Sequence, residues 1–324
     1  MIIRWGIIGP GAIANNFADG LAQSQSGKLT AIASRDPARR GSFGDKYAIA
    51  AEKRYADYAA LLADSDVDAV YVATPHPWHA ELSIMALRAG KHVLCEKPMA
   101  MNYAEACDMQ ATADDVDRIL GIAYYRRMYP KLRRAKELLD AGVIGKPVVA
   151  EATCHSWFND EDRARSWLLH RSTAGGGCLY DIASHRIDAF NFLFGKPVRA
   201  CGYTSNLVHF NDVEDNATVL MEYESGVRGI VDARWHSRVA RDEFRIRGVD
   251  GELELTPLNG PAIIFPGGRE ELPAYANVHF PCVENFVHAV LDGAPLAASG
   301  ASSLMTDQVT GWVADHAAVR YHRR

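Results

Sequence analysis

The sequence lacks the features that mark membrane proteins and nucleic-acid-binding proteins. None of its 324 residues belong to an apolar run long enough to span a bilayer. Positive charge is not in excess, because 35 Lys and Arg face 40 Asp and Glu for a net charge of -5, and a nucleic-acid partner usually requires a basic face. Internal repeats and low-complexity segments do not stand out. We therefore predict that the chain binds neither membrane nor nucleic acid.

Cysteine is scarce and scattered. The six cysteines form no C-x-x-C pair, which favours reduced, mostly buried thiols over a disulfide framework. His76 and His79 have a metal-like spacing, but two prolines accompany them and no carboxylate or thiol cluster lies nearby, so we predict no metal site. The first apolar run follows Met1 too closely to leave room for a signal peptide, and we expect a cytoplasmic location.

The N-terminus combines an apolar run with a glycine-rich turn. Residues 2–8 have strand length and β-branched character, and residues 13–21 are compatible with a helix. Between them, Gly9 permits a tight turn, Gly11 lets the backbone approach a pyrophosphate, and Ala14 lets the helix pack close to the strand. The helix N-terminus offers free N–H groups to phosphate. The residues expected to bind a dinucleotide here are Gly9, Pro10, Gly11, Ala12 and Ile13.

The end of the second apolar run, residues 29–34, indicates the preferred cofactor. A dinucleotide site that prefers NAD places an acidic residue here on the ribose 2′-hydroxyl. This chain has Ser34 and Arg35 instead, with Arg39 beyond, and these groups suit a 2′-phosphate. We predict NADP(H), with NAD(H) as the alternative. Asp36 is open to two interpretations: it caps the following helix and leaves the phosphate to its neighbours, or it binds the ribose.

Two further runs of strand length end in polar residues. Ligands bind outside the carboxyl ends of parallel strands, so these residues are expected at the cofactor edge. Lys97 is a candidate for chemistry, because a lysine in a partly apolar cleft can exchange protons, although spacing alone favours a plain turn. An exposed turn is the alternative for Glu96 and Lys97. The residues expected at this edge are Thr74, Pro75 and His79 after residues 67–73, and Glu96 and Lys97 after residues 91–95.

The order of the runs predicts an α/β protein with two domains. Strands alternate with helices through residue 122, which predicts a doubly wound parallel sheet, a Rossmann dinucleotide-binding domain over residues 1–122. Short connections between later strands favour antiparallel pairing, so residues 123–324 are expected to form an α+β substrate-binding and oligomerisation domain on a large, mostly antiparallel open sheet. Its strands are expected at 147–153, 198–209, 217–223, 226–235 and 243–247, and its helices at 130–139, 178–193, 283–291 and 302–318.

The predicted open sheet has helices for one face only, so its other face is solvated or paired. Several strands carry apolar and aromatic residues at both parities, which favours burial against a second subunit. We predict a homodimer through this sheet, and a tetramer stays open.

A glycine run at residues 175–177 precedes a helix that carries Asp181 and His185. Their separation of four residues places them on one face of an α-helix. A carboxylate beside an imidazole orients and tunes a proton donor, so we predict that both are catalytic. A satisfied surface or buried pair is the alternative.

These motifs together resemble the Gfo/Idh/MocA oxidoreductases, and the match extends over nearly the whole chain. The resemblance implies a Rossmann domain followed by an open-sheet domain that often mediates dimerisation. It also implies that Lys97 is a catalytic lysine, that His185 donates or accepts a proton, and that Asp181 is its partner or a substrate ligand. The matching motifs are Gly9-Pro10-Gly11-Ala12-Ile13-Ala14, Thr74-Pro75 with His79, Glu96-Lys97-Pro98, and the glycine run with Asp181 and His185.

The resemblance predicts an NADP(H)-dependent oxidoreductase acting on a small sugar, polyol or related hydroxy or carbonyl compound, with Lys97 and His185 in proton transfer. Tryptophan faces stack on sugar C–H surfaces, and arginines bind hydroxyls or a carboxylate. Two alternatives stay open: an NAD(H)-recycling glycosidase or epimerase-like enzyme on the same fold, and a non-catalytic sugar or cofactor sensor. The candidate substrate residues are Arg127, Trp157, Arg165, Trp167 and Arg171.

Overall fold

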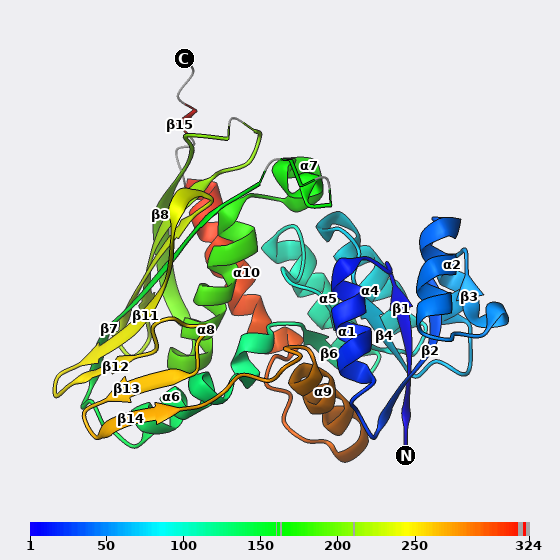
Figure 1. Cartoon of the computed structure of the whole chain (residues 1–324), viewed down its shortest axis with the longest axis horizontal. Coiled ribbons are helices and arrows are strands. Elements are labelled where there is room, and N and C mark those ends of the chain that lie inside the picture. Colours follow the sequence, from blue (N-terminus) through cyan, green and yellow to red (C-terminus); the bar gives the residue numbers. More distant parts are fainter. Residues whose placement is uncertain (160, 163, 210, 317–319, 322–324) are drawn as a thin grey trace. The chain divides into compact units, whose positions relative to one another are not determined.

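The computed structural model describes residues 1–159, 161–162, 164–209, 211–316 and 320–321. The chain divides into two compact units, coloured from blue to red along the sequence in Figure 1. The first unit comprises Met1–Tyr125 and Tyr275–Leu304, and the second comprises Arg126–Ala274 and the chain from Met305 onward. The chain first passes from the first unit to the second after Tyr125, close to the expected boundary at residue 122. The return of residues 275–304 to the first unit differs from the expectation, which places everything beyond that boundary in the second domain.

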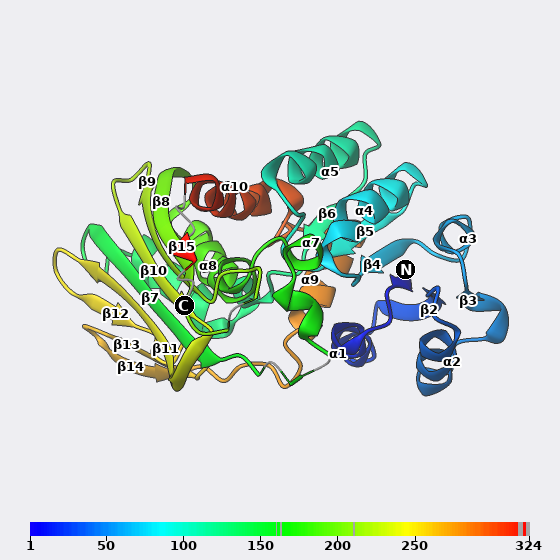
Figure 2. The same ribbon diagram turned by 90° about the horizontal axis from the view of Figure 1, so that it is seen from above.

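The first unit is built on a parallel sheet of six strands in the order β3-β2-β1-β4-β5-β6. The order reverses between β1 and β4, which confirms the predicted doubly wound Rossmann architecture. Figures 1 and 2 show α1, α2 and α9 on one face and α4 and α5 on the other. The elements are β1 (Ile3–Ile8), α1 (Ala12–Leu21), β2 (Gly27–Ala33), α2 (Pro37–Lys46), β3 (Arg54–Tyr55), α3 (Tyr58–Leu62), β4 (Ala69–Val72), α4 (His79–Arg88), β5 (His92–Cys95), α5 (Tyr103–Asp115), β6 (Leu120–Ile122) and α9 (Phe280–Asp292).

Aromatic packing explains why the late helix α9 belongs to this unit. The ring of Phe286 on α9 lies 5.1 Å from that of Trp5 on β1, and Trp5 lies 5.1 Å from Phe17 on α1. All three side chains are fully buried. Burying one large aromatic side chain contributes about 2–3 kcal/mol, so this cluster holds the segment firmly. Sequence periodicity reveals that α9 has an apolar face, but it does not reveal which sheet that face covers.

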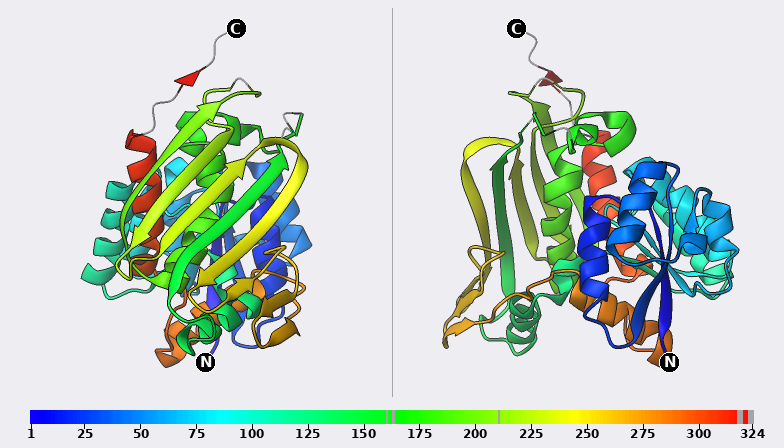
Figure 3. Two further views of the ribbon diagram at one scale, coloured as in Figure 1. Left: turned by 90° about the vertical axis from the view of Figure 1, so that its left-hand side faces the viewer. Right: turned by 45° about the vertical axis from the view of Figure 1, so that its right-hand side comes forward.

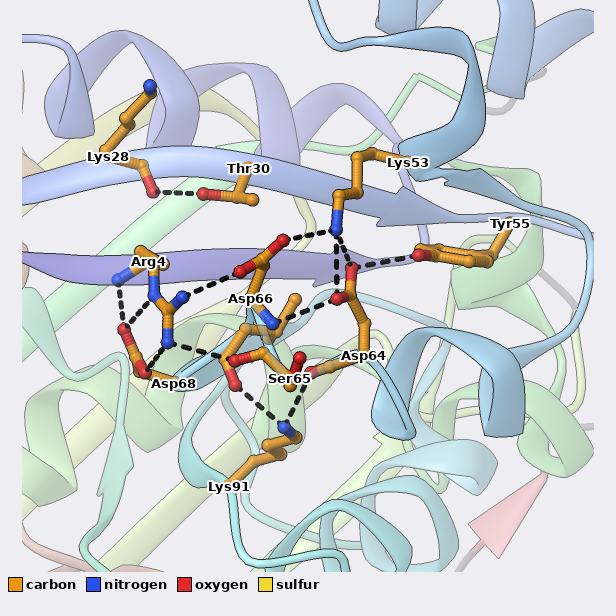
Figure 4. A network of polar contacts seen from close by, with 11 residues as sticks. Arg4, Lys28, Thr30, Lys53, Tyr55, Asp64, Ser65, Asp66, Asp68 and Lys91 are labelled. Atoms are coloured by element: carbon orange, nitrogen blue, oxygen red, sulfur yellow. Dashed lines mark hydrogen bonds and ion pairs between the residues drawn. The ribbon is translucent and has the colours of Figure 1, made fainter.

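A network of ion pairs fixes the turn that leads into β4 (Figure 4). Arg4 on β1 forks onto Asp68, with Nε–Oδ2 and Nη2–Oδ1 distances of 2.9 and 2.7 Å. Lys53 lies 2.9 Å from Asp64, and Lys91 donates to the carbonyl of Asp64 at 2.8 Å. The hydrogen bond from Arg4 is the main cause of the lowered pKa of the Asp68 carboxyl. The charged turn thereby sets where β4 starts against β1.

The second unit is built on a nine-stranded sheet in the order β14-β13-β12-β11-β7-β10-β9-β8-β15. Most neighbours are antiparallel, as predicted, but β10 pairs with β7 and β15 with β8 in parallel. Figures 2 and 3 show α8 and α10 along one face. The elements are α6 (Pro130–Asp140), β7 (Pro147–Trp157), α7 (Arg171–Ala174), α8 (Ser184–Phe194), β8 (Pro197–Asn206), β9 (Asn216–Tyr223), β10 (Arg228–Arg234), β11 (His236–Gly248), β12 (Glu252–Glu254), β13 (Ala262–Phe265), β14 (Gly268–Glu271), α10 (Gly300–His316) and β15 (Arg320–Tyr321).

The strands β12, β13 and β14 are absent from the sequence prediction. Each has three or four residues, and β12 and β14 are rich in glutamate. Such short segments show no measurable alternation of apolar and polar residues. β12 pairs with the longer strand β11, which extends well beyond the predicted run at 243–247, and β13 and β14 follow in turn.

Several outward side chains of the large sheet form ion pairs between neighbouring strands. Glu222 on β9 lies 2.5 Å from Arg199 on β8 and 3.7 Å from Arg228 on β10. The face also carries apolar side chains, among which Leu220 is 40% and Tyr203 is 78% exposed. The exposed apolar groups agree with the apolar and aromatic residues that several strands carry at both parities, and cross-strand ion pairs lie among them. Among the helices that the structure describes, none is long and apolar enough to cross a bilayer.

Candidate active site

The glycine turn after β1 has the backbone conformation that the dinucleotide motif needs. Gly9 has a φ of 88°, and a Cβ there would lie 2.9 Å from the carbonyl oxygen of Ala73 after β4. Any side chain would be strained by both the backbone and the contact. An added Cβ at Gly11 would meet nothing within 4 Å, and α1 begins here with no side-chain cap. The open backbone N–H groups of this helix N-terminus fit a pyrophosphate.

Asp36 caps α2, in agreement with the first of its two interpretations. Its Oδ1 accepts hydrogen bonds from the backbone N–H groups of Ala38 at 2.9 Å and Arg39 at 3.1 Å. These are two of the N–H groups that a helix leaves without an internal partner. The carboxylate is therefore engaged by the helix start.

Two exposed arginines lie beside the end of β2. The guanidinium carbon of Arg35 lies 5.2 Å from the ring centroid of Trp78 and 5.7 Å from that of Tyr58. These cation–π contacts restrict where the Arg35 side chain can lie. Arg39 is 71% exposed. Ser34 is mostly buried, and its hydroxyl accepts from the backbone N–H two residues later at 3.3 Å. The arginines thus supply most of the accessible positive surface at this strand end.

His79 is fully buried, which corrects its predicted role in touching the cofactor. Its Nδ1 lies 2.8 Å from the carbonyl oxygen of Pro98, and its Nε2 lies 2.8 Å from that of Thr74. Burial lowers the pKa of His79 even though both carbonyls favour the charged ring. The imidazole therefore clamps together the loops after β4 and β5, and it shapes the cofactor edge through them.

Glu96 is also buried, and its carboxylate faces inward. The Tyr71 hydroxyl and His279 Nε2 both approach its Oε1, the latter at 3.2 Å. Its Oε2 accepts the backbone N–H of Lys97 at 3.1 Å. Burial would raise the pKa of Glu96, but the hydrogen bonds from His279 and Tyr71 and the charge of Lys97 outweigh it and lower that pKa. Glu96 is thus a mostly buried anion beside the half-buried Lys97, and its contact with a cofactor stays a prediction.

The glycine run of the second unit gives room to Glu214. Glu214 Oε1 accepts the backbone N–H groups of Gly177 at 2.7 Å and Leu179 at 3.1 Å. A Cβ at Gly177 would collide with the carbonyl oxygen of Glu214, so only glycine fits. Burial raises the pKa of the Glu214 carboxyl. This residue caps the helical segment that carries the predicted Asp181 and His185.

That helical segment begins with a π-helical turn, Leu179–Ala183, and continues as α8. Asp181 lies in the π turn and His185 in the first turn of α8. Four residues cover slightly more than one turn of an α-helix and slightly less than one turn of a π-helix, so both positions stay near one face, and the catalytic pairing of Asp181 with His185 stays a prediction. Asp181 Oδ2 accepts from Arg165 at 3.0 Å, and His185 is 6% exposed.

Arg127 is buried, which corrects its expected role as a substrate ligand. Its guanidinium forks onto Asp188 of α8, with distances of 2.9 Å from Nε and 2.5 Å from Nη2. The side chains are 2% and 1% exposed, and Thr306 of α10 donates to the same carboxylate at 3.2 Å. Burial raises the pKa of Asp188 against the opposing charge of Arg127. Asp188 therefore holds Arg127 against α8, and its hydrogen bond from Thr306 joins α8 to α10.

The other substrate candidates retain exposed surface. Arg165 and Arg171 are 47% and 46% exposed. Trp157, at the end of β7, is 38% exposed, and the guanidinium of Arg238 lies 3.8 Å from its ring centroid. Trp167 is half-buried in a short 3-10 turn, where its carbonyl accepts the hydroxyl of the nearby Thr173. These four side chains remain candidates.

Sequence patterns did not reveal His279, Tyr71 or Glu214. Tyr71 reads as one more apolar member of β4, and His279 lies in a segment expected to belong to the other domain. Glu214 lies in a turn with no periodic pattern. The sequence signal nearest to it is the glycine run at residues 175–177, against which its side chain packs. Among the described residues, no group of three or more His, Cys, Asp or Glu could hold a metal ion.

Comparison with known proteins gives two family matches. Residues 3–124 match the profile described as "Oxidoreductase family, NAD-binding Rossmann fold", and residues 132–254 match the GFO/IDH/MocA C-terminal domain. The chain is 33% identical to trans-1,2-dihydrobenzene-1,2-diol dehydrogenase of Mus musculus, over 84% of this chain and 80% of that protein. It is 31% identical to 1,5-anhydro-D-fructose reductase of Ensifer adhaerens, over 90% of this chain and 88% of that protein.

Solved structures share the fold over almost the whole chain. The aldose-aldose oxidoreductase of Caulobacter crescentus, complexed with glycerol, has a TM-score of 0.89 at 26% identity, covering 98% of both chains. An oxidoreductase of Agrobacterium radiobacter in complex with NAD+, L-tartaric acid and magnesium also has a TM-score of 0.89, at 24% identity, covering 98% of this chain and 97% of that one.

The relatives are named dehydrogenases and reductases, and both halves of the chain match the same family. The match over residues 3–124 includes the glycine turn after β1, the capped α2 and the buried Glu96 beside Lys97. The chain belongs to the Gfo/Idh/MocA family of NAD(P)-dependent oxidoreductases.

Proposed function

We propose that this enzyme moves a hydride between NADP(H) and the secondary hydroxyl or carbonyl carbon of a sugar, polyol or related compound. The observation that carries the choice of NADP(H) is the capping of α2 by Asp36. An acidic side chain on the ribose would repel a 2′-phosphate, whereas here the carboxylate is engaged and Arg35 and Arg39 are exposed beside it.

The residues after β1 and β2 fit such a cofactor. The open space over Gly11 and the uncapped first turn of α1 would hold the pyrophosphate. Arg35 and Arg39 would bind the 2′-phosphate, with the Ser34 hydroxyl beside them. The bound nicotinamide supplies the chemistry of accepting or giving a hydride.

The remaining chemistry is movement of one proton at the substrate oxygen. Lys97 and His185 are the proposed groups for it, and Asp181 is proposed to orient the imidazole or bind the substrate. In oxidation, Lys Nζ or a histidine ring nitrogen removes the hydroxyl proton, and in reduction the same group returns it. A positioned group of this kind contributes about a hundredfold or more to the rate.

The printed names of the relatives support the substrate class. One is a reductase of an anhydro sugar, one an aldose oxidoreductase, and one a dehydrogenase of a trans-diol. These compounds share a secondary oxygen next to another hydroxyl-bearing carbon. Trp157 and Trp167 would stack on the C–H faces of such a ring, and Arg165 and Arg171 would bind its hydroxyls.

The proposal is tested by following nicotinamide absorbance with NADP(H) and NAD(H) against aldoses, polyols, keto-sugars and trans-diols in both directions. We expect stoichiometric conversion of NADP(H) with at least one of these classes. Tight cofactor binding without net conversion would contradict it, and would favour the recycling enzyme or the sensor instead. Faster turnover with NAD(H) than with NADP(H) would overturn the cofactor assignment alone.

A further inference from the structure

His279 lies at the start of α9, in the segment that returns to the first unit. It is 1% exposed, and its ring centroid lies 5.5 Å from that of Tyr125. Its backbone N–H donates to the Asn277 side chain at 2.8 Å. Its Nε2 lies 3.2 Å from Oε1 of Glu96 and carries the proton of that hydrogen bond, because the carboxylate can only accept. The imidazole is thus held in place by its surroundings and aimed at one oxygen.

Tyr71 approaches the same oxygen from β4. Its hydroxyl donates to Oε1 of Glu96, and its ring stacks on Phe17 with centroids 3.9 Å apart and an interplanar angle of 7°. Burial raises the pKa of Tyr71 well above its usual value, so the hydroxyl keeps its proton and remains a donor. Two buried donors from separate elements therefore fix one oxygen of the carboxylate.

The second oxygen of Glu96 acts on the loop itself. Oε2 accepts the backbone N–H of Lys97 at 3.1 Å. The lysine side chain is a flexible stem of four carbons, so the position of its amine depends on a well-fixed backbone at Lys97 itself. An error of about 1 Å in the position of a catalytic group can reduce a rate a hundredfold.

We propose that His279 is a positioning residue for Lys97 and acts through the carboxylate of Glu96. This inference rests on the proposed role of Lys97 in proton transfer. Without His279, Oε1 keeps one of its two donors, the carboxylate can rotate, and the Lys97 N–H loses a fixed acceptor. Gly9, Gly11 and Arg35, which are proposed to bind the cofactor, take no part in these interactions of His279 and are not altered by this change.

The test compares His279→Leu with His279→Gln, whose side-chain amide can donate from about the position of Nε2. We expect His279→Leu to lower kcat about tenfold or more with little change in the Kd for NADPH, and His279→Gln to recover most of that loss. His92→Leu is the matched control, because His92 is a half-buried histidine at the opposite end of β5 whose ring accepts a hydrogen bond from the backbone N–H of Ile119 and does not touch Glu96.

A double-mutant cycle with Glu96→Gln separates positioning from general damage. If His279 acts through Glu96, adding His279→Leu to Glu96→Gln has little further effect on kcat. Fully additive losses, or a His279→Gln enzyme no better than His279→Leu, would overturn the proposal.

Hydrogen exchange at the Lys97 amide gives a readout that needs no activity. We expect faster exchange of this amide in His279→Leu, slower exchange again in His279→Gln, and no change in His92→Leu. Unchanged exchange in His279→Leu would contradict the inference. If the wild-type protein shows no nicotinamide conversion, the proposed function fails, while the exchange experiment still decides whether His279 fixes the Lys97 backbone.

Discussion

At the scale of single residues, the proposed preference for NADP(H) depends most on Arg35. We expect Arg35→Ala to raise KM for NADP(H) about tenfold to a hundredfold, because a hydrogen bond to a charged group contributes about 1.5–3 kcal/mol. KM for NAD(H) should change little, since NAD(H) has no 2′-phosphate. The exposed Arg88 at the far end of α4 gives the matched control Arg88→Ala. Equal changes for both cofactors would contradict this role.

Lys97 and His185 make a second residue-scale prediction. Each alanine variant should lose about a hundredfold in kcat, the usual contribution of a positioned acid or base. Stopped-flow measurement of hydride transfer, with fluorescence titration of NADPH as the control, separates this loss from weakened cofactor binding. A normal hydride-transfer rate in both variants would refute their assignment.

At the scale of elements, the start of α8 depends on the fit between the glycine run and Glu214. We expect Gly177→Ala to lower the free energy of unfolding by about 1–3 kcal/mol or more, because the new Cβ collides with the Glu214 carbonyl and displaces the cap. Gly41→Ala is the control, since its Cβ meets nothing and α2 gains about 0.5–1 kcal/mol from the replacement. Denaturant unfolding measures both, and equal stabilities would contradict the account of this cap.

The turn before β4 makes a prediction about pH. Arg4 holds the pKa of Asp68 below its unfolded value of about 3.9, so the ionised carboxyl stabilises the folded state above that pH. This stabilisation is lost as the pH falls through the lower, folded pKa. Thermal unfolding midpoints should therefore fall more steeply with acid in the wild type than in Asp68→Asn. Parallel curves would show that this pair does not govern acid stability.

Individual strands, helices and caps were more predictable from the sequence than the contacts between side chains of distant elements. The strand–turn–helix at Gly9, the cap at Asp36 and the helix at 130–139 follow from local sequence, and the structure contains each of them. The inward turn of Glu96, the burial of His79 and the pairing of Arg127 with Asp188 depend on side chains from distant elements. Sequence spacing carries no information about those meetings, so the residue types were found and several of their roles were not.

At the scale of the whole molecule, we propose a homodimer that forms through the nine-stranded sheet. Its sheet carries exposed Leu220 and Tyr203 among ion pairs, so an interface there would combine apolar contact with charge complementarity. We expect a dimeric mass by light scattering, and a shift toward monomer in Leu220→Asp. A monomeric mass for the wild type across a range of concentrations would contradict the dimer.

The proposed hydride transfer is tested most directly by following a label from the cofactor to the product. NADPH carrying deuterium at the transferable position is incubated with the best carbonyl substrate, and the product is analysed by mass spectrometry. We predict one deuterium in each product molecule, NADP⁺ formed in equal amount, and about a hundredfold less labelled product in the same time with Lys97→Ala. A product without deuterium, or conversion of substrate with the NADPH left unchanged, would contradict net hydride transfer.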